Sequence, residues 1–549
     1  MSAVSHDAHA QAARTTPATI DALFEPYTQP GSPGAAVGVY HQGQQVYAKG
    51  YGLADVEAGT PITPQTRFHV ASVSKQFAAF AVAMLAREGK VDLDADVRTY
   101  LPYVPDFGQT ITVRHLILHT SGLRDQWSLF GLGGQDTDGR LRQRQVVNMV
   151  ARQRALNFAP GSEYAYSNTG YTLLAEIVHA ASGQTLREFT TARVFRPLGM
   201  NATFFFDNLE EIVPGRANSY ERDGEDKPWK RSPLNYDNVG ATSLFTTVED
   251  MAKWAGNFTD PKVGDRALIE QVTTNGTLDD GTPIEYGFAL IRTQLDGRNV
   301  ITHSGSDAGF RAIFYYYPDH DFAVMITANT PYKMDLSDKV KAIANLYLPA
   351  AKAAVATQLP AVRNDPALAA QIAGTYLPQY DRALTLLVKD GALHQAGRDG
   401  ATTPLVLRAD GSFDDGKRDN FYRPVRAKDG KVVALERHAS KPYPPPLRLE
   451  RAPGAAAADL SRYAGDYRSA ELDITYTLAV DGGELVVDSI WSAQPTRLRP
   501  VAPDRFESQG WALGSVVFEP GKAKPGHFLV HSGRVRHIRF DRVAQESTP

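Results

Sequence analysis

The sequence contains no cysteine, almost no net charge and no long apolar run. The missing cysteines exclude disulfides, thiol nucleophiles and sulfur-ligated metal sites, although they do not decide the cellular compartment. Lys and Arg number 58 against 61 Asp and Glu, and this net charge of -3 gives no electrostatic reason to expect a nucleic-acid partner. No apolar stretch approaches the roughly 18 to 20 residues that span a bilayer, so we also expect no membrane-spanning segment.

Histidine is present but is not grouped into a ligand motif. The 14 His residues include no His-Glu-x-x-His sequence or comparable cluster, so we predict neither a metal site nor a cofactor. With 549 residues, of which 43% are hydrophobic and 22% charged, the chain has the make-up of a globular protein. Its length predicts about two to four domains.

The first residues carry an ambiguous export signal. Ala8-His9-Ala10 has the small-x-small form of a signal cleavage site, but no apolar segment precedes it within 1–7. The match is either fortuitous or the end of a longer leader. We favour an exported parent, periplasmic or secreted, over a cytoplasmic one.

Ser72-Val73-Ser74-Lys75 has a pattern that can generate a nucleophile. It places a hydroxyl and an amine three positions apart, on one face of the helix predicted by the apolar run Phe77 to Leu85. Burial lowers the pKa of a lysine, and a neutral amine at Lys75 can then take the proton of Ser72. The S-x-x-K pattern also arises by chance, so it needs partners elsewhere in the chain.

Two segments are candidate partners. Tyr166-Ser167-Asn168 follows the turn at 160–163 and precedes an apolar helical run, which places it on a loop entering a helix. His303-Ser304-Gly305-Ser306 precedes a turn at 307–309 and a β-rich run, which predicts the edge of a strand. Each alone has a plain structural explanation, as core packing for the tyrosine and as a structural group for the histidine.

In this order, Ser72-x-x-Lys75, Tyr166-x-Asn168 and His303-x-Gly305 resemble the motifs of the penicillin-recognising serine hydrolases. That family includes class C β-lactamases, D,D-peptidases, related esterases and D-aminopeptidases. The likeness covers residues 20 to 350 and includes the spacer segments 112–123, 245–251 and 286–288. Three motifs in sequence order make a chance match improbable.

The resemblance implies a role for the residues of the first two motifs. Ser72 is the acylated nucleophile, and Lys75 and Tyr166 share the proton transfers. Which of the two is the base during acylation is disputed for S-x-x-K enzymes, and the sequence leaves it open. Asn168 hydrogen-bonds the amide of the substrate.

The third motif, with His303, Gly305 and Ser306, implies the substrate-binding and oxyanion side of the site. The backbone N–H groups of Ser72 and Ser306 form the oxyanion hole, and losing one such donor costs ~10²–10³ in rate. Penicillin-directed members usually carry Lys-Thr-Gly or Lys-Ser-Gly here, and that lysine holds the carboxylate of the substrate. His303 supplies no dependable charge at neutral pH, which favours substrates without a free carboxylate at that end.

The resemblance implies a β-lactamase-like α+β fold for the first domain, with an antiparallel sheet flanked by helices and an added helical region. A hairpin at 35–50 and strands at 312–317 and 322–327 are the expected parts of that sheet, and 335–348 is a closing helix. Further on, Ile372 to Tyr376 recurs as Tyr463 to Tyr467, and Gly430-Lys431-Val432 recurs as Gly533-Arg534-Val535. The repeat indicates two copies of a small antiparallel, lipocalin-like β-barrel.

These observations divide the chain into six parts. We predict a flexible N-terminus at 1–20, the catalytic domain at 21–350, a linker at 351–364, a first barrel at 365–451, a linker at 452–458 and a second barrel at 459–549.

A catalytic domain followed by two barrels resembles the bacterial D-aminopeptidase branch, and segments 121–127 and 465–473 look like that enzyme's sequence. In that branch a loop of the last barrel reaches the active site, but the matching region at Asp488 to Ser492 is altered, which puts its contact in doubt. We predict a serine hydrolase that forms an acyl-enzyme at Ser72 and acts on amides or short peptides with an N-terminal D-amino acid. Its partner is a small-molecule or short-peptide substrate, and a homodimer is left open.

Two alternatives remain open. The same residues would serve a carboxylesterase, or a weak β-lactamase or D,D-peptidase of the same family. A protein of another class, a non-catalytic binder of cell-wall peptides, would use the barrels for recognition and leave Ser72 unmodified by a serine-directed phosphonate.

Overall fold

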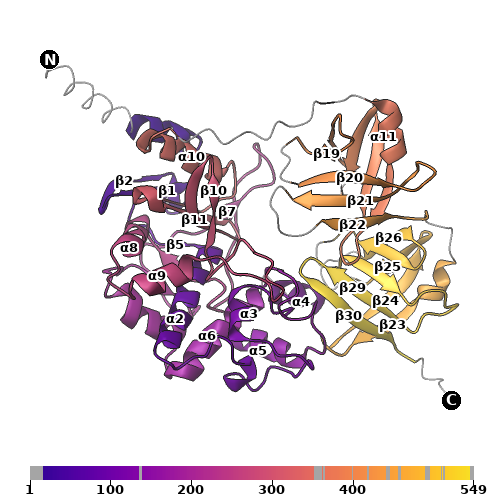
Figure 1. The fold of residues 1–549 in the computed structure, drawn as a ribbon, viewed down its shortest axis with the longest axis horizontal. Coiled ribbons are helices and arrows are strands. Elements are labelled where there is room, and N and C mark those ends of the chain that lie inside the picture. The colour runs from indigo at the N-terminus through magenta and orange to yellow at the C-terminus, as the bar shows by residue number, and fades with distance from the viewer. Residues whose placement is uncertain are drawn as a thin grey trace.

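The computed structural model describes residues 17–134, 139–350, 362, 365–397, 400–416, 420–439, 446–454, 459–488, 495–508, 510 and 513–544. A mixed region of helices and strands comes first, followed by a nearly closed sheet and then by a closed barrel (Figure 1). This architecture confirms the predicted fold class, a β-lactamase-like α+β region with two barrel-like sheets after it.

A six-stranded antiparallel sheet forms the centre of the first region, in the order β10-β11-β12-β13-β1-β2. Its strands are β1 (Ala35–His41), β2 (Gln44–Tyr51), β10 (Ile291–Leu295), β11 (Arg298–Asp307), β12 (Phe310–Tyr317) and β13 (Phe322–Ala328). Along β1, Ala36 and Tyr40 belong to one apolar cluster, whereas Val37 and Val39 belong to the cluster on the opposite face. This is the alternation of side chains that a strand imposes. The expected hairpin and closing strands are therefore present.

Helices pack on both faces of this sheet and form a helical region beside it. They are α2 (Lys75–Arg87), α3 (Val113–Ile117), α4 (Gln126–Leu132), α5 (Gln143–Arg152), α6 (Asn168–Ser182), α7 (Leu186–Thr190), α8 (Val248–Thr259), α9 (Arg266–Thr273) and α10 (Leu336–Tyr347). Helix α8 packs on β1 and β13, and α10 packs on β12 and β13. Helix α2 is buried from Lys75 to Leu85 and packs on α6, as its apolar sequence predicts.

Three small strand groups complete the first region. They are β3 (Leu53–Asp55) with β4 (Thr60–Pro61), β5 (Phe68–His69) with β9 (Leu244–Thr246) and β6 (Phe204–Phe205), and β7 (Tyr220–Glu221) with β8 (Lys230–Arg231).

Two antiparallel barrel-like sheets follow. The first begins after α11 (Pro366–Ile372) and contains β14 (Gly374–Leu377), β15 (Leu384–Lys389), β16 (Ala392–Ala396), β17 (Thr402–Pro404), β18 (Val406–Leu407), β19 (Phe413–Asp414), β20 (Asn420–Arg426), β21 (Val432–Ala439) and β22 (Leu447–Arg451). The second closes fully through β23 (Gly465–Ser469), β24 (Ile474–Asp481), β25 (Glu484–Val487), β26 (Thr496–Ala502), β27 (Arg505–Ser508), β28 (Ser515–Phe518), β29 (His527–Ser532) and β30 (Val535–Arg542).

The two barrels begin with the same local structure, which explains the sequence repeat. Gly374 and Gly465 start the first strand of each copy, with φ of +153° and +135°. A Cβ atom would come within 3.0 Å of the Arg451 guanidinium at Gly374 and within 2.7 Å of the Arg542 guanidinium at Gly465. Each arginine belongs to the last strand of its own barrel, so the repeated glycine leaves room for a repeated closing contact.

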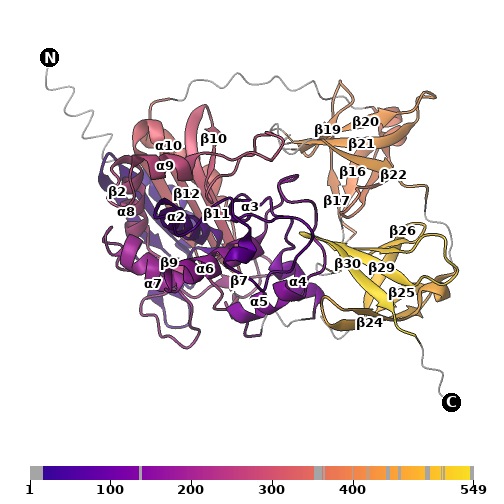
Figure 2. The same cartoon turned by 60° about the horizontal axis from the view of Figure 1, so that its bottom comes forward.

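The second barrel packs directly on the helical part of the first region, beside α4 and α5 in both ribbon views (Figures 1 and 2). One apolar cluster runs without interruption from α2 into this barrel, whereas the first barrel has a core of its own. The Tyr476 hydroxyl donates to the carbonyl of Leu132 at 2.5 Å. The second barrel and the helices thus share a core.

A buried ion pair lies in the same interface. Arg124 Nη1 lies 2.5 Å from Glu471 Oε2, and both residues are buried. The Arg124 guanidinium also donates to the carbonyls of Arg536 and His537, at 2.9 Å each. Arg124 and Glu471 come from the two segments whose sequences resemble the D-aminopeptidase branch, and the fold brings these segments into contact.

Several predicted boundaries fall largely outside the described residues. Among them are Ala8-His9-Ala10, most of the linker at 351–364, the second half of the linker at 452–458 and all but Asp488 of the loop at 488–492. Ile20 is fully buried in the apolar cluster of α10, so the folded chain begins before the predicted residue 21. The other domain boundaries stay predictions.

We expect Glu471→Leu to destabilise the protein by ~3–5 kcal/mol, because it leaves the buried Arg124 charge unpaired. Urea denaturation followed by circular dichroism measures the loss. The double variant Arg124→Met/Glu471→Leu should recover most of it, since no charge then stays buried.

The matched control for this prediction is Arg468→Gln, which breaks an exposed pair with Asp473. Its effect should stay below ~0.5 kcal/mol. Equal unfolding midpoints for Glu471→Leu and this control would contradict a stabilising role for the buried pair.

Candidate active site

Ser72 and Lys75 lie on adjoining short elements at the start of the buried helix. Ser72 belongs to a 3₁₀ turn (Ala71–Ser74) that runs directly into α2, of which Lys75 is the first residue. Ala71 has a φ of +48°, an uncommon conformation for a residue with a Cβ atom. The turn thus places the hydroxyl next to the amine, and Lys75 Nζ lies 3.0 Å from Ser72 Oγ.

The Lys75 amine is surrounded by oxygen atoms in a dry environment. Besides Ser72, it donates to Asn168 Oδ1 at 2.8 Å and to the carbonyl of Ala241 at 2.7 Å. Burial lowers the pKa of Lys75 to about 7, and the Arg534 charge also lowers it, while Asp125 and Asp307 act in the opposite direction. A large fraction of this lysine is therefore neutral near pH 7.

Asp125 fixes the orientation of Asn168. Asp125 Oδ2 accepts from both the backbone N–H and Nδ2 of Asn168, each at 2.8 Å. Because Nδ2 faces Asp125, Oδ1 must face Lys75. Asp125 lies in the segment 121–127 that resembles the D-aminopeptidase branch, but no motif in the sequence assigns it a role in the site.

Tyr166 lies beside the amine, on the loop that enters α6. The Lys75 amine is 4.9 Å from the centre of its ring, and the ring of His119 is 4.2 Å away. Burial raises the pKa of Tyr166, although a hydrogen bond with Ser72 and the Arg534 charge oppose this shift. The phenol therefore stays protonated at neutral pH.

His303 lies on β11 and carries no charge at neutral pH. Burial, together with the Lys75 charge, lowers its pKa to about 3. Its Nδ1 lies 2.7 Å from the carbonyl of Ser304, and because a carbonyl only accepts, Nδ1 carries the hydrogen. Nε2 then accepts from the Tyr286 hydroxyl at 3.1 Å. This agrees with the expectation that His303 supplies no positive charge.

Gly305 allows β11 to pass close to the turn that carries Ser72. A Cβ atom at this position would lie 2.2 Å from the carbonyl oxygen of Val70 and 3.1 Å from the backbone nitrogen of Ser72. No side chain fits in that space, so glycine is required for the contact. The next residue, Ser306, lines the same cavity as Ser72.

The predicted residues meet around one cavity of about 400 Å³. Its walls include Ser72, Tyr166, Asn168, His303 and Ser306, while Lys75 and Gly305 contact this wall directly. All seven candidate residues from the sequence are therefore brought together.

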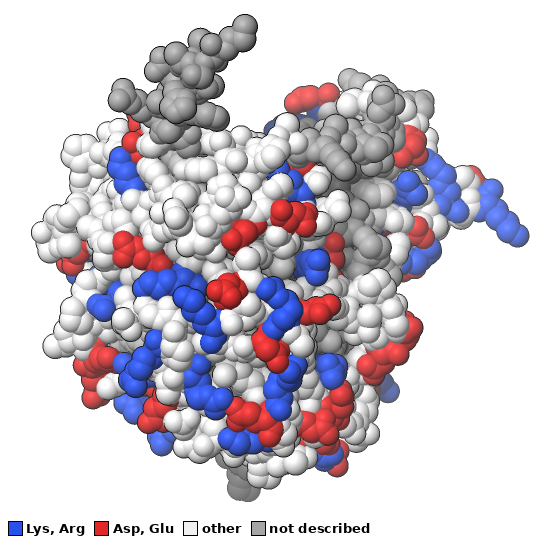
Figure 3. All heavy atoms as spheres, turned by 60° about the vertical axis from the view of Figure 1, so that its left-hand side comes forward, with Lys and Arg blue, Asp and Glu red and all other residues white. Residues whose placement is uncertain are grey.

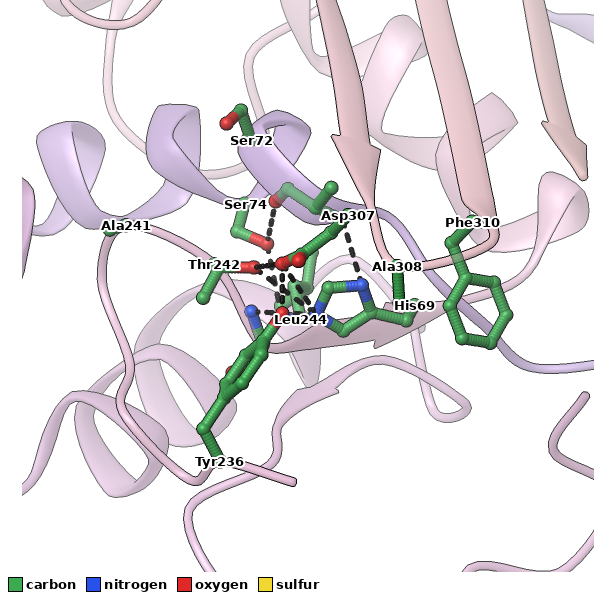
Figure 4. A network of polar contacts seen from close by, with 12 residues as sticks. His69, Ser72, Ser74, Tyr236, Ala241, Thr242, Leu244, Asp307, Ala308 and Phe310 are labelled. Carbon is green, nitrogen blue, oxygen red and sulfur yellow. Dashed lines mark hydrogen bonds and ion pairs between the residues drawn. The ribbon is translucent and has the colours of Figure 1, made fainter. Parts of the chain in front are cut away.

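Asp307 is a wall residue that sequence reasoning passed over as part of a turn. It ends β11 and reaches toward Thr242 and Tyr236 (Figure 4). Its Oδ2 accepts from Thr242 Oγ1 at 2.8 Å and from the Tyr236 hydroxyl. His69 lies next to this group, and burial lowers its pKa to about 4, so the hydroxyls rather than a cation hold the carboxylate.

Arg534 also enters the cavity, from the turn between β29 and β30 of the second barrel. Its guanidinium lies 4.7 Å from the centre of the Tyr166 ring and 3.8 Å from Asp125 Oδ2. The sequence indicated Gly533-Arg534-Val535 as a repeat landmark alone. The loop expected to enter the site, Asp488 to Ser492, lies outside the described residues beyond Asp488.

Three further observations on the described part of the chain concern metal ions, membrane-spanning helices and charged surface patches. No group of three His, Asp or Glu side chains there could hold a metal ion. None of its helices is long and apolar enough to cross a membrane. On the face drawn in Figure 3, basic and acidic side chains are interspersed rather than gathered into a patch of one sign.

Comparison with known proteins supports the resemblance to the penicillin-recognising serine hydrolases. The Beta-lactamase family profile matches residues 20–347. A D-aminopeptidase of Brucella canis is 27% identical over 459 residues, which are 82% of this chain and 82% of that protein. A D-aminopeptidase of Gluconobacter oxydans is 30% identical over 315 residues, 57% of this chain and 58% of that protein.

The fold likeness extends to solved structures. The D-amino acid amidase of Ochrobactrum anthropi SV3 superimposes with a TM-score of 0.52 at 22% identity, over 60% of this chain and 98% of that one. At this identity the likeness concerns the fold alone. The predicted resemblance to the penicillin-recognising serine hydrolases, near the D-aminopeptidases, is confirmed by the family profile and the two relatives. The chain is thus a hydrolase that belongs to the Beta-lactamase family.

Proposed function

We propose that this protein is a serine hydrolase that forms an acyl-enzyme at Ser72 and releases N-terminal D-amino acids from amides or short peptides. The observation that carries this proposal is the contact of the Ser72 hydroxyl with the partly neutral Lys75 amine at the wall of a substrate-sized cavity. The names of two relatives, both D-aminopeptidases, support the choice of substrate.

Lys75 is the base of the acylation step in this proposal. Two of its hydrogens are directed to Asn168 Oδ1 and the carbonyl of Ala241, so the lone pair of the neutral amine faces Ser72 Oγ. Tyr166 keeps its proton at neutral pH and is poorly suited to accept another. The sequence left this choice open, and the hydrogen-bond pattern favours the lysine.

The proposed reaction has two steps, acylation of Ser72 and hydrolysis of the acyl-enzyme. Ser72 Oγ bonds to the carbonyl carbon as its proton passes to Lys75, and the backbone N–H groups of Ser72 and Ser306 stabilise the oxyanion. When the C–N bond breaks, Tyr166 donates its proton to the leaving amine and regains one from Lys75. Water then attacks the ester carbonyl and gives a proton to Lys75. As the bond from the carbonyl carbon to Ser72 Oγ breaks, Lys75 returns that proton to Ser72 and the amino acid is released.

Substrate recognition is assigned to groups that remain available. Oδ1 of Asn168 accepts from Lys75, and one Nδ2 hydrogen of Asn168 is donated to Asp125. The second Nδ2 hydrogen is therefore available to the substrate amide. The carboxylate of Asp307 directly follows the oxyanion residue Ser306, where the α-ammonium group of an N-terminal residue would lie. Asp307 is therefore the proposed partner of that ammonium group.

The first test is a panel of D- and L-aminoacyl amides with the wild type and Ser72→Ala. We expect release of D-alanine or a similar small D-residue, a preference over the L-series, and a loss of up to ~10⁶ in kcat without the nucleophile. Chromatography of the released amino acid gives the rate, and mass spectrometry of a fluorophosphonate adduct on Ser72 checks the nucleophile independently.

If no aminoacyl amide in the panel is cleaved while a short-chain aryl ester is, the carboxylesterase alternative replaces the aminopeptidase. Absence of the adduct together with absence of turnover would favour the non-catalytic binder.

The second test uses pH. Because Lys75 must be neutral to act as the base and its pKa is about 7, kcat/KM should rise about tenfold per pH unit below that value and level off above it. A neutral aryl ester is the substrate of choice, since it has no titratable group of its own. Lys75→Arg, which stays protonated, should lose ~10²–10⁴ in kcat/KM. A profile that stays flat through neutrality argues against the lysine base.

The third test concerns Asp307. Asp307→Asn keeps an oxygen acceptor for Thr242 and Tyr236 but loses the charge, so kcat/KM for D-alanine amide should fall about 10–100-fold. The neutral ester should be affected less than about threefold. Asp319→Asn, in the turn after β12, is the matched control and should change neither substrate. An equal loss on both substrates would assign Asp307 a structural role instead.

A further inference from the structure

Arg534 is held in the active-site wall by its backbone. Its carbonyl accepts from Asn157 Nδ2 at 2.9 Å and from the backbone N–H of Asp125 at 3.3 Å. Gly533 before it has a φ of +57° and completes the tight turn between β29 and β30. The second barrel therefore presents this side chain to the cavity at a fixed position.

The guanidinium group retains donors for a ligand. Its side chain is 49% exposed, and the nearest carboxylate oxygen, Asp125 Oδ2, lies 3.8 Å away, beyond hydrogen-bond distance. That oxygen already accepts two hydrogen bonds from Asn168. Contact with the Tyr166 ring orients the guanidinium without using its N–H groups.

Arg534 supplies the fixed charge that the third sequence motif lacks. His303 is neutral, and Lys75 is buried and loses much of its charge near pH 7. An arginine keeps its charge at any physiological pH, and its planar fork matches the two oxygens of a carboxylate.

We propose that Arg534 binds the carboxylate of the residue that leaves, so that the preferred substrates are free dipeptides with an N-terminal D-residue. This inference rests on the proposed aminopeptidase function. It assigns the two charged ends of one small substrate to two walls of one cavity, with the ammonium group at Asp307 and the carboxylate at Arg534. Two extended residues span only about 7 Å, so a longer peptide would carry its carboxylate past the guanidinium.

A structural role is the competing explanation, because Arg534 also helps to join the second barrel to Asp125. Arg536 offers a matched control. It lies two residues further along the same strand edge and pairs with Glu163 of the first region at 3.1 Å, but it does not line the cavity.

The experiment compares D-alanyl-glycine, D-alanine amide and D-alanyl-glycyl-glycine with the wild type, Arg534→Gln, Arg534→Lys and Arg536→Gln. The wild type should prefer the dipeptide. Arg534→Gln should lower kcat/KM for the dipeptide about 10–100-fold more than for the amide, mainly through KM, because any change in the Lys75 pKa affects both substrates alike. Arg534→Lys should retain part of the preference, and Arg536→Gln should retain all of it.

Equal losses on dipeptide and amide in Arg534→Gln, or a wild type without preference for the dipeptide, would overturn the proposal. Should the aminopeptidase function itself fail, the acetate esters of phenol and of 3-hydroxybenzoate still test Arg534, because they differ by a carboxylate on the leaving group. A preference for the charged ester that disappears in Arg534→Gln supports the carboxylate site. If the wild type shows no preference for the charged ester, the carboxylate site is rejected.

Discussion

Desolvation of the Lys75 amine is the constraint on which the site depends. A lysine in water holds its proton to a pKa above 10, and a protonated amine cannot act as a base. The apolar sequence of α2 buries Lys75, and the three oxygen acceptors around it compensate the lost hydration. The pKa near 7 that results balances a buried amine against the opposing charges of Asp125 and Arg534.

Asp125 connects this chemistry to the rest of the molecule. Its side chain caps the start of α4, orients Asn168 and lies next to Arg534, while Arg124 beside it forms the buried pair with Glu471. The loop at 124–125 therefore contacts both Asn168 and the second barrel. The barrel is thus joined directly to the wall of the candidate active-site cavity.

Much of the fold could be predicted from local patterns. The alternation in β1, the apolar run of α2 and the glycines that start β14 and β23 each act over a few residues, and each formed the expected element. The first barrel remained an open sheet while the second closed, and the repeat gave no sign of this difference. Closure depends on pairing between strands that are distant in the sequence.

The sequence by itself determined the candidate residues of the cavity, because Ser72-x-x-Lys75, Tyr166-x-Asn168 and His303-x-Gly305 occur in the order that resembles the penicillin-recognising serine hydrolases. Local turns and helices set the spacing only within each motif. Only the tertiary structure decided which charged side chains lie near these residues. In the sequence, Asp307 lies in a predicted turn, Asp125 in a family-like segment and Arg534 in a repeat landmark. In the structure, Asp307 and Arg534 line the cavity, and Asp125 lies directly behind Asn168. Electrostatic interaction depends on distance in space and not on distance along the chain. Arg534 lies more than 450 positions from Ser72, and it reaches the site only because the helices and the second barrel share one apolar core.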